Sequence, residues 1–265
     1  MSVYATDHHA SVLRAHSWRT AQNSIAYLLP SIKPTMKVLD VGCGPGTITL
    51  DVAKLVPEGH ITGVDYTEAP LAAARAAASG EKLANVDFQV GDVQALPFEA
   101  ETFDIVYAHQ VLQHVRDPVQ ALREMKRVAK KGGLVGARES ASMTWYPQWT
   151  LLTQWKDLHM RVSRGHGGNP DPGSWIHVWA REAGFGSEDV RCSAGTWLFS
   201  TKEEREWWSA VWGERLAASG FAEKAVNGGY CTHEDLEKFA AAWREWGKDE
   251  DGWFSILHGE IICHV

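Results

Sequence analysis

The segment VLDVGCGPG, residues 38–46, decides the fold that we expect for this chain. Its first residues have the apolar pattern of a short buried strand, and three glycines follow directly. Gly42, Gly44 and Gly46 allow the backbone to turn tightly and to approach a ligand without Cβ clashes. The helix expected after them would offer unpaired N–H groups at its start to a carboxylate or phosphate. The segment therefore predicts a strand, a turn and a helix that together bind a small molecule.

Strand and helix patterns alternate along the rest of the first half. We expect strands at 37–41, 60–64, 86–90, 103–108, from 134 to at least 137, 190–194 and 254–265. We expect helices at 7–29, from the glycine turn to 56, 67–80, from 117 to a stop at Gly132-Gly133, 148–162, 175–183, 201–218 and 232–246. Alternation at these crossover lengths predicts an α/β fold with a parallel, doubly wound sheet. The late helical pair before the last strand predicts a cap inserted near the end of the sheet.

Composition and charge exclude several classes of protein. The chain has 265 residues and a formal net charge of −7, so nothing in its overall charge favours nucleic acid or an anionic membrane as partner. No stretch approaches the roughly 18 to 20 apolar residues of a membrane span, and no secretory signal is visible. The four cysteines are far apart with no CxxC pair, which indicates reduced thiols in a cytoplasmic protein without a metal site.

The residues around the glycine turn distinguish between two nucleotide ligands. Counted from Gly42, the dinucleotide fingerprint GxGxxG needs its third glycine at position 47, where this chain has Thr47. Asp40 precedes the first glycine by two positions, and its carboxylate would meet an ammonium group well and a pyrophosphate badly. The ligand is therefore expected to carry an amino acid at this end.

Two further acidic residues fit the rest of such a ligand. Asp65 ends the second strand, where a carboxylate can accept hydrogen bonds from both ribose hydroxyls. Asp92 closes the third strand and can accept an N–H from the exocyclic amine of adenine, while Val93 and Leu96 cover the ring. An amino acid, a ribose and an adenine in this order describe S-adenosylmethionine.

The sequence resembles the class I S-adenosylmethionine-dependent methyltransferases, closest to the branch of ubiquinone and menaquinone biosynthesis C-methyltransferases. The resemblance covers residues 36–140 through the motifs VLDVGCGPG, GVD, GDVQALPF, FDIVYAHQVLQHV and DPVQALREMKRVAKKGG. It implies a mostly parallel, seven-stranded Rossmann-like sheet with strand order 3-2-1-4-5-7-6 and an antiparallel strand 7. It also implies Asp65 on the ribose, Asp92 and Val93 at adenine, and His109 with Gln110 beside the methionine part.

The division of the chain follows from these motifs. We expect one methyltransferase domain over residues 1–265, with an N-terminal helical lid (1–35), a cofactor-binding core (36–140) and a substrate-binding cap region (141–265). Cys43 and Tyr66 are expected beside the cofactor, Cys43 as a small filler.

The candidate catalytic and substrate residues are less certain from sequence. A general base is needed only for an acceptor that arrives protonated, and the candidates are His109, Glu139, His159 and His166. Twelve of the 13 Trp lie in the second half, where an aromatic pocket is as consistent with the pattern as an aromatic core. The substrate candidates are Tyr4, Trp18, Trp145, Tyr146 and Trp149. The cluster of Trp207, Trp208 and Trp212 fits a packed cap or a dimer face equally well.

The sequence therefore predicts an enzyme of the EC 2.1.1 type that moves a methyl group in line from S-adenosylmethionine to a small hydrophobic or aromatic molecule, releasing S-adenosylhomocysteine. A monomer and a homodimer both fit. Two alternatives stay open: a non-methylating enzyme such as a cyclase, and a catalytically silent cofactor-binding regulator on the same scaffold.

Overall fold

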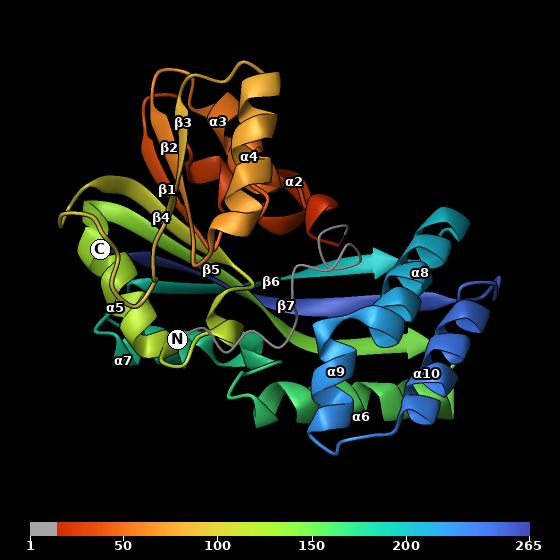
Figure 1. Ribbon diagram of the computed structural model, residues 1–265. Helices are drawn as coiled ribbons and strands as arrows, with labels where there is room; N and C mark the ends of the chain where they lie inside the picture. The colour runs from red at the N-terminus through yellow and green to blue at the C-terminus, as the bar shows by residue number, and fades with distance from the viewer. Residues whose placement is uncertain (1–14) are drawn as a thin grey trace.

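A seven-stranded sheet forms the centre of the computed structural model, which describes residues 15–265 (Figure 1). The strands are β1 (Lys37–Val41), β2 (His60–Asp65), β3 (Val86–Val90), β4 (Phe103–His109), β5 (Ala129–Tyr146), β6 (Val190–Phe199) and β7 (Trp253–His264). Their order is β3-β2-β1-β4-β5-β7-β6. β1 to β5 run parallel, while β7 is antiparallel to both β5 and β6. The expected strand order and the antiparallel seventh strand are confirmed.

Helices cover both faces of the sheet. They are α2 (Ala21–Ser24), α3 (Thr47–Leu55), α4 (Glu68–Gly80), α5 (Pro118–Val128), α6 (Thr150–Gly165), α7 (Ile176–Glu182), α8 (Lys202–Ala218), α9 (Gly220–Asn227) and α10 (His233–Trp246), with short 3-10 turns η1 (Leu29–Ser31), η2 (Leu112–His114) and η3 (Pro172–Ser174). None of the helices within residues 15–265 combines the length and apolar character that crossing a membrane requires.

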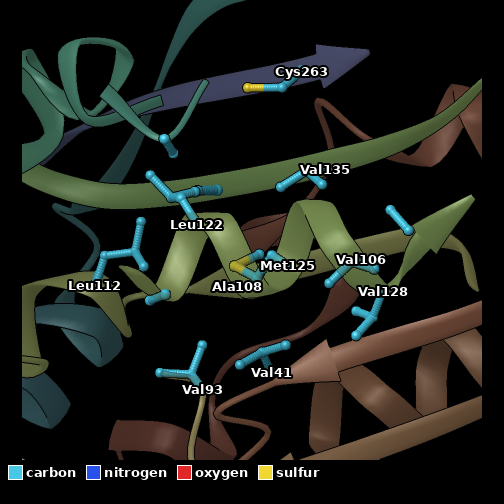
Figure 2. Close-up of a cluster of buried hydrophobic side chains, with 14 of the residues drawn as sticks. Val41, Val93, Val106, Ala108, Leu112, Leu122, Met125, Val128, Val135 and Cys263 are labelled. Carbon is cyan, nitrogen blue, oxygen red and sulfur yellow. The ribbon is translucent and has the colours of Figure 1, made fainter. Parts of the chain in front are cut away.

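Alternate residues of the central strands build two separate cores. Leu39 and Val106 belong to the core beneath α5 and α7, while Val38 and Ile105 face the core that includes α3. Figure 2 shows the first of these, where Met125 of α5 lies among side chains from several strands. Because successive side chains of a strand point to opposite faces, the nearly unbroken apolar runs of β1 and β4 are those of strands buried on both sides.

The order of the strands leaves a crevice above β1 and β4. The sheet extends from β1 to β2 and β3 on one side and from β4 to β5 on the other. The connections that leave the carboxyl ends of β1 and β4 therefore diverge to opposite faces. In open α/β sheets, ligands bind at this point of reversal.

The second half adds an aromatic lobe to the sheet. β5, β6 and β7 continue beyond the parallel strands, and α6, α8, α9 and α10 pack on this extension (Figure 1). Trp155, Trp243 and Trp246 are completely buried there. The ring centroids of Trp155 and Trp243 are 4.8 Å apart in an edge-to-face arrangement, which aromatic pairs favour.

Two boundaries differ from the sequence expectation because glycine was interpreted as a helix stop. The pair Gly132-Gly133 lies inside β5, and α5 ends earlier, at Val128. At Gly133, an added Cβ would lie 2.8 Å from the carbonyl oxygen of Asp104, so a glycine is needed for close packing against β4. β5 consequently begins at Ala129 instead of near 134.

The expected helix over 7–29 is wrong where the structure describes it. Residues 15–17 are helical, the chain then turns, and α2 begins anew at residue 21. Thr20 and Asn23 form a capping box, in which each side chain bonds the backbone of the other, so a helix starts here instead of passing through. The sequence reasoning also missed α9, which follows α8 after the single cap residue Ser219.

Candidate functional site

One cavity, with a volume of about 340 Å³, lies at the carboxyl ends of β1 to β4. It is lined by the residues predicted to bind the cofactor, with the exception of Gly46 and Leu96: Asp40, Gly42, Cys43, Gly44, Asp65, Tyr66, Asp92, Val93, His109 and Gln110. We call this space the strand-end cavity. Residues from four separate strands and their loops thus converge on one site.

The glycine turn is held in place by the strand beside it. The backbone N–H groups of Gly42 and Cys43 donate to the carbonyl oxygen of Val64 at 2.7 and 3.0 Å. Asp65 Oδ2 accepts from the N–H of Gly44 at 3.0 Å, and its Oδ1 accepts from Thr67 N–H at 3.3 Å. One carboxylate therefore fixes the turn and also lines the cavity.

Gly46 does not line the cavity and packs instead against α4 and β3. Its φ is +78°, and an added Cβ would lie 2.8 Å from Ala74 Cβ and 2.9 Å from the ring of Phe88. Gly132 offers a matched control because its φ is +74° and an added Cβ would meet nothing within 4 Å.

We expect Gly132→Ala to lower the free energy of unfolding by about 1–2 kcal/mol, the cost of a left-handed residue with a Cβ. Gly46→Ala should lower the free energy of unfolding by about 1–3 kcal/mol more than Gly132→Ala, because its Cβ would overlap with α4 and β3. It should also weaken binding in the strand-end cavity. Denaturant unfolding of both variants measures the difference. Equal losses would show that the packing around Gly46 is not the constraint that we describe.

Asp40 is buried at the floor of the strand-end cavity. Its Oδ2 accepts a hydrogen bond from Thr49 Oγ1 at 2.6 Å, from the first turns of α3. Burial raises the pKa of this carboxyl to about 6, against the opposing effect of hydrogen bonds from Thr49 and Tyr107. A cationic group in the cavity would stabilise the ionised form.

Asp92 and Val93 close the far side of the cavity. Asp92 Oδ1 accepts from Gln94 N–H at 2.9 Å, which bends the chain just after β3. Val93 is a buried member of the core shown in Figure 2, with part of its surface on the cavity wall. An apolar wall beside a fixed carboxylate suits a flat heterocycle with an exocyclic amine.

His109 and Gln110 follow β4 and differ in their bonding. His109 is only 3% exposed, and neither of its ring nitrogens has a hydrogen-bond partner among residues 15–265. Burial, together with nearby Arg19, holds the pKa of His109 well below its usual value, so the ring is neutral. A buried polar group without a partner is costly unless a ligand completes it.

Gln110 connects three parts of the molecule. It adopts a left-handed conformation with φ +54°, its Oε1 accepts from Arg19 Nη2 at 2.8 Å, and its Nε2 lies 2.8 Å from Nε2 of His258. Arg19 was a sequence candidate for a lid over the cofactor, whereas His258 was not identified from the sequence. They come from opposite ends of the chain, and only the folded sheet brings them to β4.

The second cavity, which we call the aromatic cavity, has a volume of about 120 Å³. Four of its lining residues are Trp: Trp18, Trp197, Trp208 and Trp212. It shares a further four with the strand-end cavity: His16, Arg19, Gln110 and His114. The two cavities are therefore adjacent, and these four residues border both.

Most of the predicted substrate residues lie elsewhere. Trp18 lines the aromatic cavity, whereas Trp145, Tyr146 and Trp149 line neither cavity. Trp145 is buried against Phe254 in the aromatic core, Trp149 packs on its edge, and Tyr146 is 57% exposed. The long β5 carries these side chains away from the crevice. Tyr4 lies outside the described residues.

The candidate bases have different surroundings. Glu139 is buried with its oxygens facing the backbone N–H groups of Val111, Leu112 and Gln113, so it caps the turn after β4 and lines neither cavity. His166 also lies outside both cavities, with Nδ1 2.9 Å from the carbonyl oxygen of Val162. These two do not fit a catalytic role. His159 lines the aromatic cavity and His109 the strand-end cavity.

A buried network joins the aromatic cavity to the N-terminal segment. Arg138 of β5 donates to the carbonyl oxygens of Asn23 and Ser24 at 2.6 and 3.1 Å, and its Nε lies 3.2 Å from Oε1 of Glu260. Trp197 Nε1 donates to the same Asn23 oxygen at 2.6 Å. The segment that carries Trp18 and Arg19 is thereby anchored to β5 and β6.

Four imidazoles at this site should make the protein sensitive to acid. Burial lowers the pKa of His258 to about 2, of His114 to about 3 and of His159 to about 4, and that of His109 is also low. Below pH 6.5 these groups gain protons in the unfolded chain but not in the folded one. The free energy of unfolding therefore decreases as the pH is lowered.

Two carboxyls act in the opposite direction. Burial raises the pKa of Glu139 to about 8 and that of Asp40 to about 6, so each can hold a proton when folded that it loses on unfolding. Unfolding below pH 6.5 is then accompanied by a net uptake of about two protons. Each pH unit below 6.5 therefore lowers the free energy of unfolding by about 2–3 kcal/mol. Denaturant unfolding from pH 7.5 to 5.5 measures this pH dependence. In the His258→Gln variant, the net proton uptake on unfolding should be smaller by about one proton. A stability that stays constant over this range would contradict the neutral imidazoles.

Comparison with known proteins identifies the family. A methyltransferase domain family matches residues 32–199, and the chain belongs to it. An uncharacterized methyltransferase of Schizosaccharomyces pombe is 37% identical, over 98% of this chain and 95% of its own length. The demethylmenaquinone methyltransferase of Roseiflexus castenholzii is 32% identical over 62% of this chain and 66% of its own.

A solved structure extends the match to the whole fold. A methyltransferase-fold protein of Bacillus halodurans superposes with a TM-score of 0.59 at 21% identity, over 90% of this chain and 96% of that one. The resemblance that the motifs indicated is thus confirmed at the level of family and fold. Among residues 15–265 there is no group of three or more His, Cys, Asp or Glu placed to hold a metal ion.

Proposed function

We propose that this chain binds S-adenosylmethionine in the strand-end cavity and transfers its methyl group to a small, hydrophobic or aromatic molecule in the aromatic cavity. The observation that carries the proposal is the junction of the two cavities at Arg19, Gln110 and their neighbours. A donor on one side and an acceptor on the other would meet there. The family supports the reaction class.

The residues of the strand-end cavity fit the parts of the cofactor. Asp65 would accept from the ribose hydroxyls, Asp92 with Val93 would bind adenine, and Asp40 would attract the ammonium group. The unpartnered ring of His109 would complete its hydrogen bonds on the methionine part. The cofactor supplies a methyl group on a sulfonium, which is already a good leaving group.

The chain's own contribution is then mainly position and exclusion of water. Gln110 is held from two sides and keeps its place at the junction. The apolar and aromatic walls of the second cavity orient the acceptor and keep water from it. Orientation of this kind can supply about 7–11 kcal/mol of the barrier. His109 and His159 stay neutral, and their low pKa values make them weak bases.

The experiment that tests this function is release of S-adenosylhomocysteine in the presence of candidate acceptors. We expect release that depends on the acceptor, with the methyl group of labelled S-adenosylmethionine recovered in the acceptor by mass spectrometry. Trp212→Leu should lower the rate while cofactor affinity stays within a few-fold, because Trp212 lines only the aromatic cavity. Tight cofactor binding with no methyl transfer to any small aromatic acceptor would favour the silent regulator instead.

A further inference from the structure

The chemistry of the aromatic cavity selects the charge of its occupant. Apolar lining comes from Met143 and Ile256 in addition to the four Trp. Trp18 and Trp197 meet edge to face with ring centroids 5.2 Å apart, and so do Trp208 and Trp212 at 6.1 Å. Walls of this kind suit a flat ring of modest size.

Two of the four Trp rings already have the protein's own cations over their faces. The guanidinium groups of Arg19 and Arg138 lie over the Trp197 ring at 5.5 and 5.3 Å from its centroid. That of Arg215 lies over Trp212 at 4.5 Å. A cationic ligand would need such a face for itself, as the recognition of ammonium groups by aromatic cages shows. Among the described residues that line this cavity there is also no Asp or Glu.

The charged side chains that border this cavity, among the described residues, are cationic. Arg19 and Arg215 both line it. A guanidinium group donates through five N–H groups, accepts no hydrogen bond and keeps its positive charge. Groups of this kind favour an occupant that brings acceptor oxygens and a negative charge.

We propose that the occupant of the aromatic cavity is a small aromatic acid, with an ionised carboxylate or acidic hydroxyl that meets the guanidinium groups of Arg19 and Arg215. This inference rests on the proposed function only in calling the occupant the methyl acceptor. The preference for an aromatic acid follows from the residues that line the cavity. An acceptor that is already ionised is also nucleophilic without a protein base.

Three isosteric probes test the proposal: benzoate, benzamide and benzamidinium. They share one ring and one planar substituent and differ in charge. Calorimetric titration of the full chain, with and without saturating S-adenosylhomocysteine, should show benzoate binding at least about tenfold more tightly than benzamidinium, with benzamide between them. Equal or tighter binding of benzamidinium would overturn the proposal, and so would failure of all three probes to bind.

Two variants assign the selectivity to the guanidinium groups. Arg215→Met keeps an apolar chain but removes the charge and its donors, so benzoate affinity should fall about tenfold while that of benzamidinium does not fall. Arg244→Met is the matched control because Arg244 is exposed and lines neither cavity. It should leave both affinities unchanged. An unchanged benzoate affinity in Arg215→Met would contradict the role of its charge.

The same titrations separate the inference from the proposed function. If S-adenosylhomocysteine binds but benzamidinium is preferred, the function stands and the inference fails. If benzoate is preferred but neither S-adenosylhomocysteine nor S-adenosylmethionine binds, the cavity has the proposed chemistry and the methyltransferase function fails.

Discussion

Replacing Asp65 by Ala is expected to weaken the binding of S-adenosylmethionine by roughly 10²-fold or more. Each charge-assisted hydrogen bond to a ribose hydroxyl contributes about 1.5–3 kcal/mol, and two are lost. The variant also removes the acceptor for Gly44 N–H, so the glycine turn loses one of its ties to β2. Calorimetric titration measures the affinity, and thermal unfolding measures whether the fold is retained.

Two other variants separate the role of Asp65 from a general loss of charge. Asp65→Asn keeps one oxygen for the turn and should lose less affinity than Asp65→Ala. Asp87→Ala removes an exposed carboxylate of β3 that pairs with His60 outside the cavity, and should leave affinity within about twofold. Normal binding by Asp65→Ala would show that the ribose is placed wrongly.

Replacing Arg138 by Met is expected to destabilise the fold by about 3–5 kcal/mol. Arg138 is buried, and its removal leaves the carboxylate of Glu260 buried without its guanidinium partner. The carbonyl oxygen of Ser24 also loses its donor, and that of Asn23 keeps only Trp197 Nε1. Release of this segment should loosen Arg19 and the wall of the aromatic cavity, so benzoate affinity should fall even at temperatures where the variant stays folded.

A double variant shows whether the buried charge is the cause. Arg138→Met with Glu260→Gln should recover part of the loss because the unpaired charge is gone, whereas the exposed Arg123→Met should cost less than about 0.5 kcal/mol. Denaturant unfolding of the four proteins, wild type included, measures both differences. A loss for Arg138→Met below about 1 kcal/mol would contradict the anchoring role of this network.

The strand-end cavity was predictable because its residues follow one another along the chain. Asp40, Asp65 and Asp92 each end a strand, and parallel strands bring their carboxyl ends to one edge of the sheet. Strand periodicity and the glycine turn were therefore enough to place them together, and the cavity contains all three. The resemblance to a known family then supplied the strand order.

The aromatic cavity was not predictable in the same way. Trp197 and Trp208 belong to β6 and α8, and the pairing of β6 with β7 and of β7 with β5 brings them to this cavity. Their sequence pattern fits a core as well as a pocket, since both bury one side of an aromatic ring. The concentration of Trp in the second half was the only signal, and it indicated the region but not the residues.

Polar groups of the interior were missed for a related reason. Glu139 was a candidate base from the sequence, yet in the fold three backbone N–H groups donate to its oxygens. Arg138 and His258 looked unremarkable in sequence because their partners lie more than a hundred residues away. Hydrogen bonds over such distances along the chain cannot be inferred from local spacing.

The central claim is that the strand-end cavity is built for S-adenosylmethionine and not for a dinucleotide. Calorimetric titration of the wild-type chain with S-adenosylmethionine, S-adenosylhomocysteine and NAD tests it most directly. We expect one equivalent of each of the first two to bind, and no measurable binding of NAD, because Asp40 on the cavity floor disfavours a pyrophosphate. NAD binding of comparable affinity, or no binding of S-adenosylmethionine and S-adenosylhomocysteine, would contradict the account.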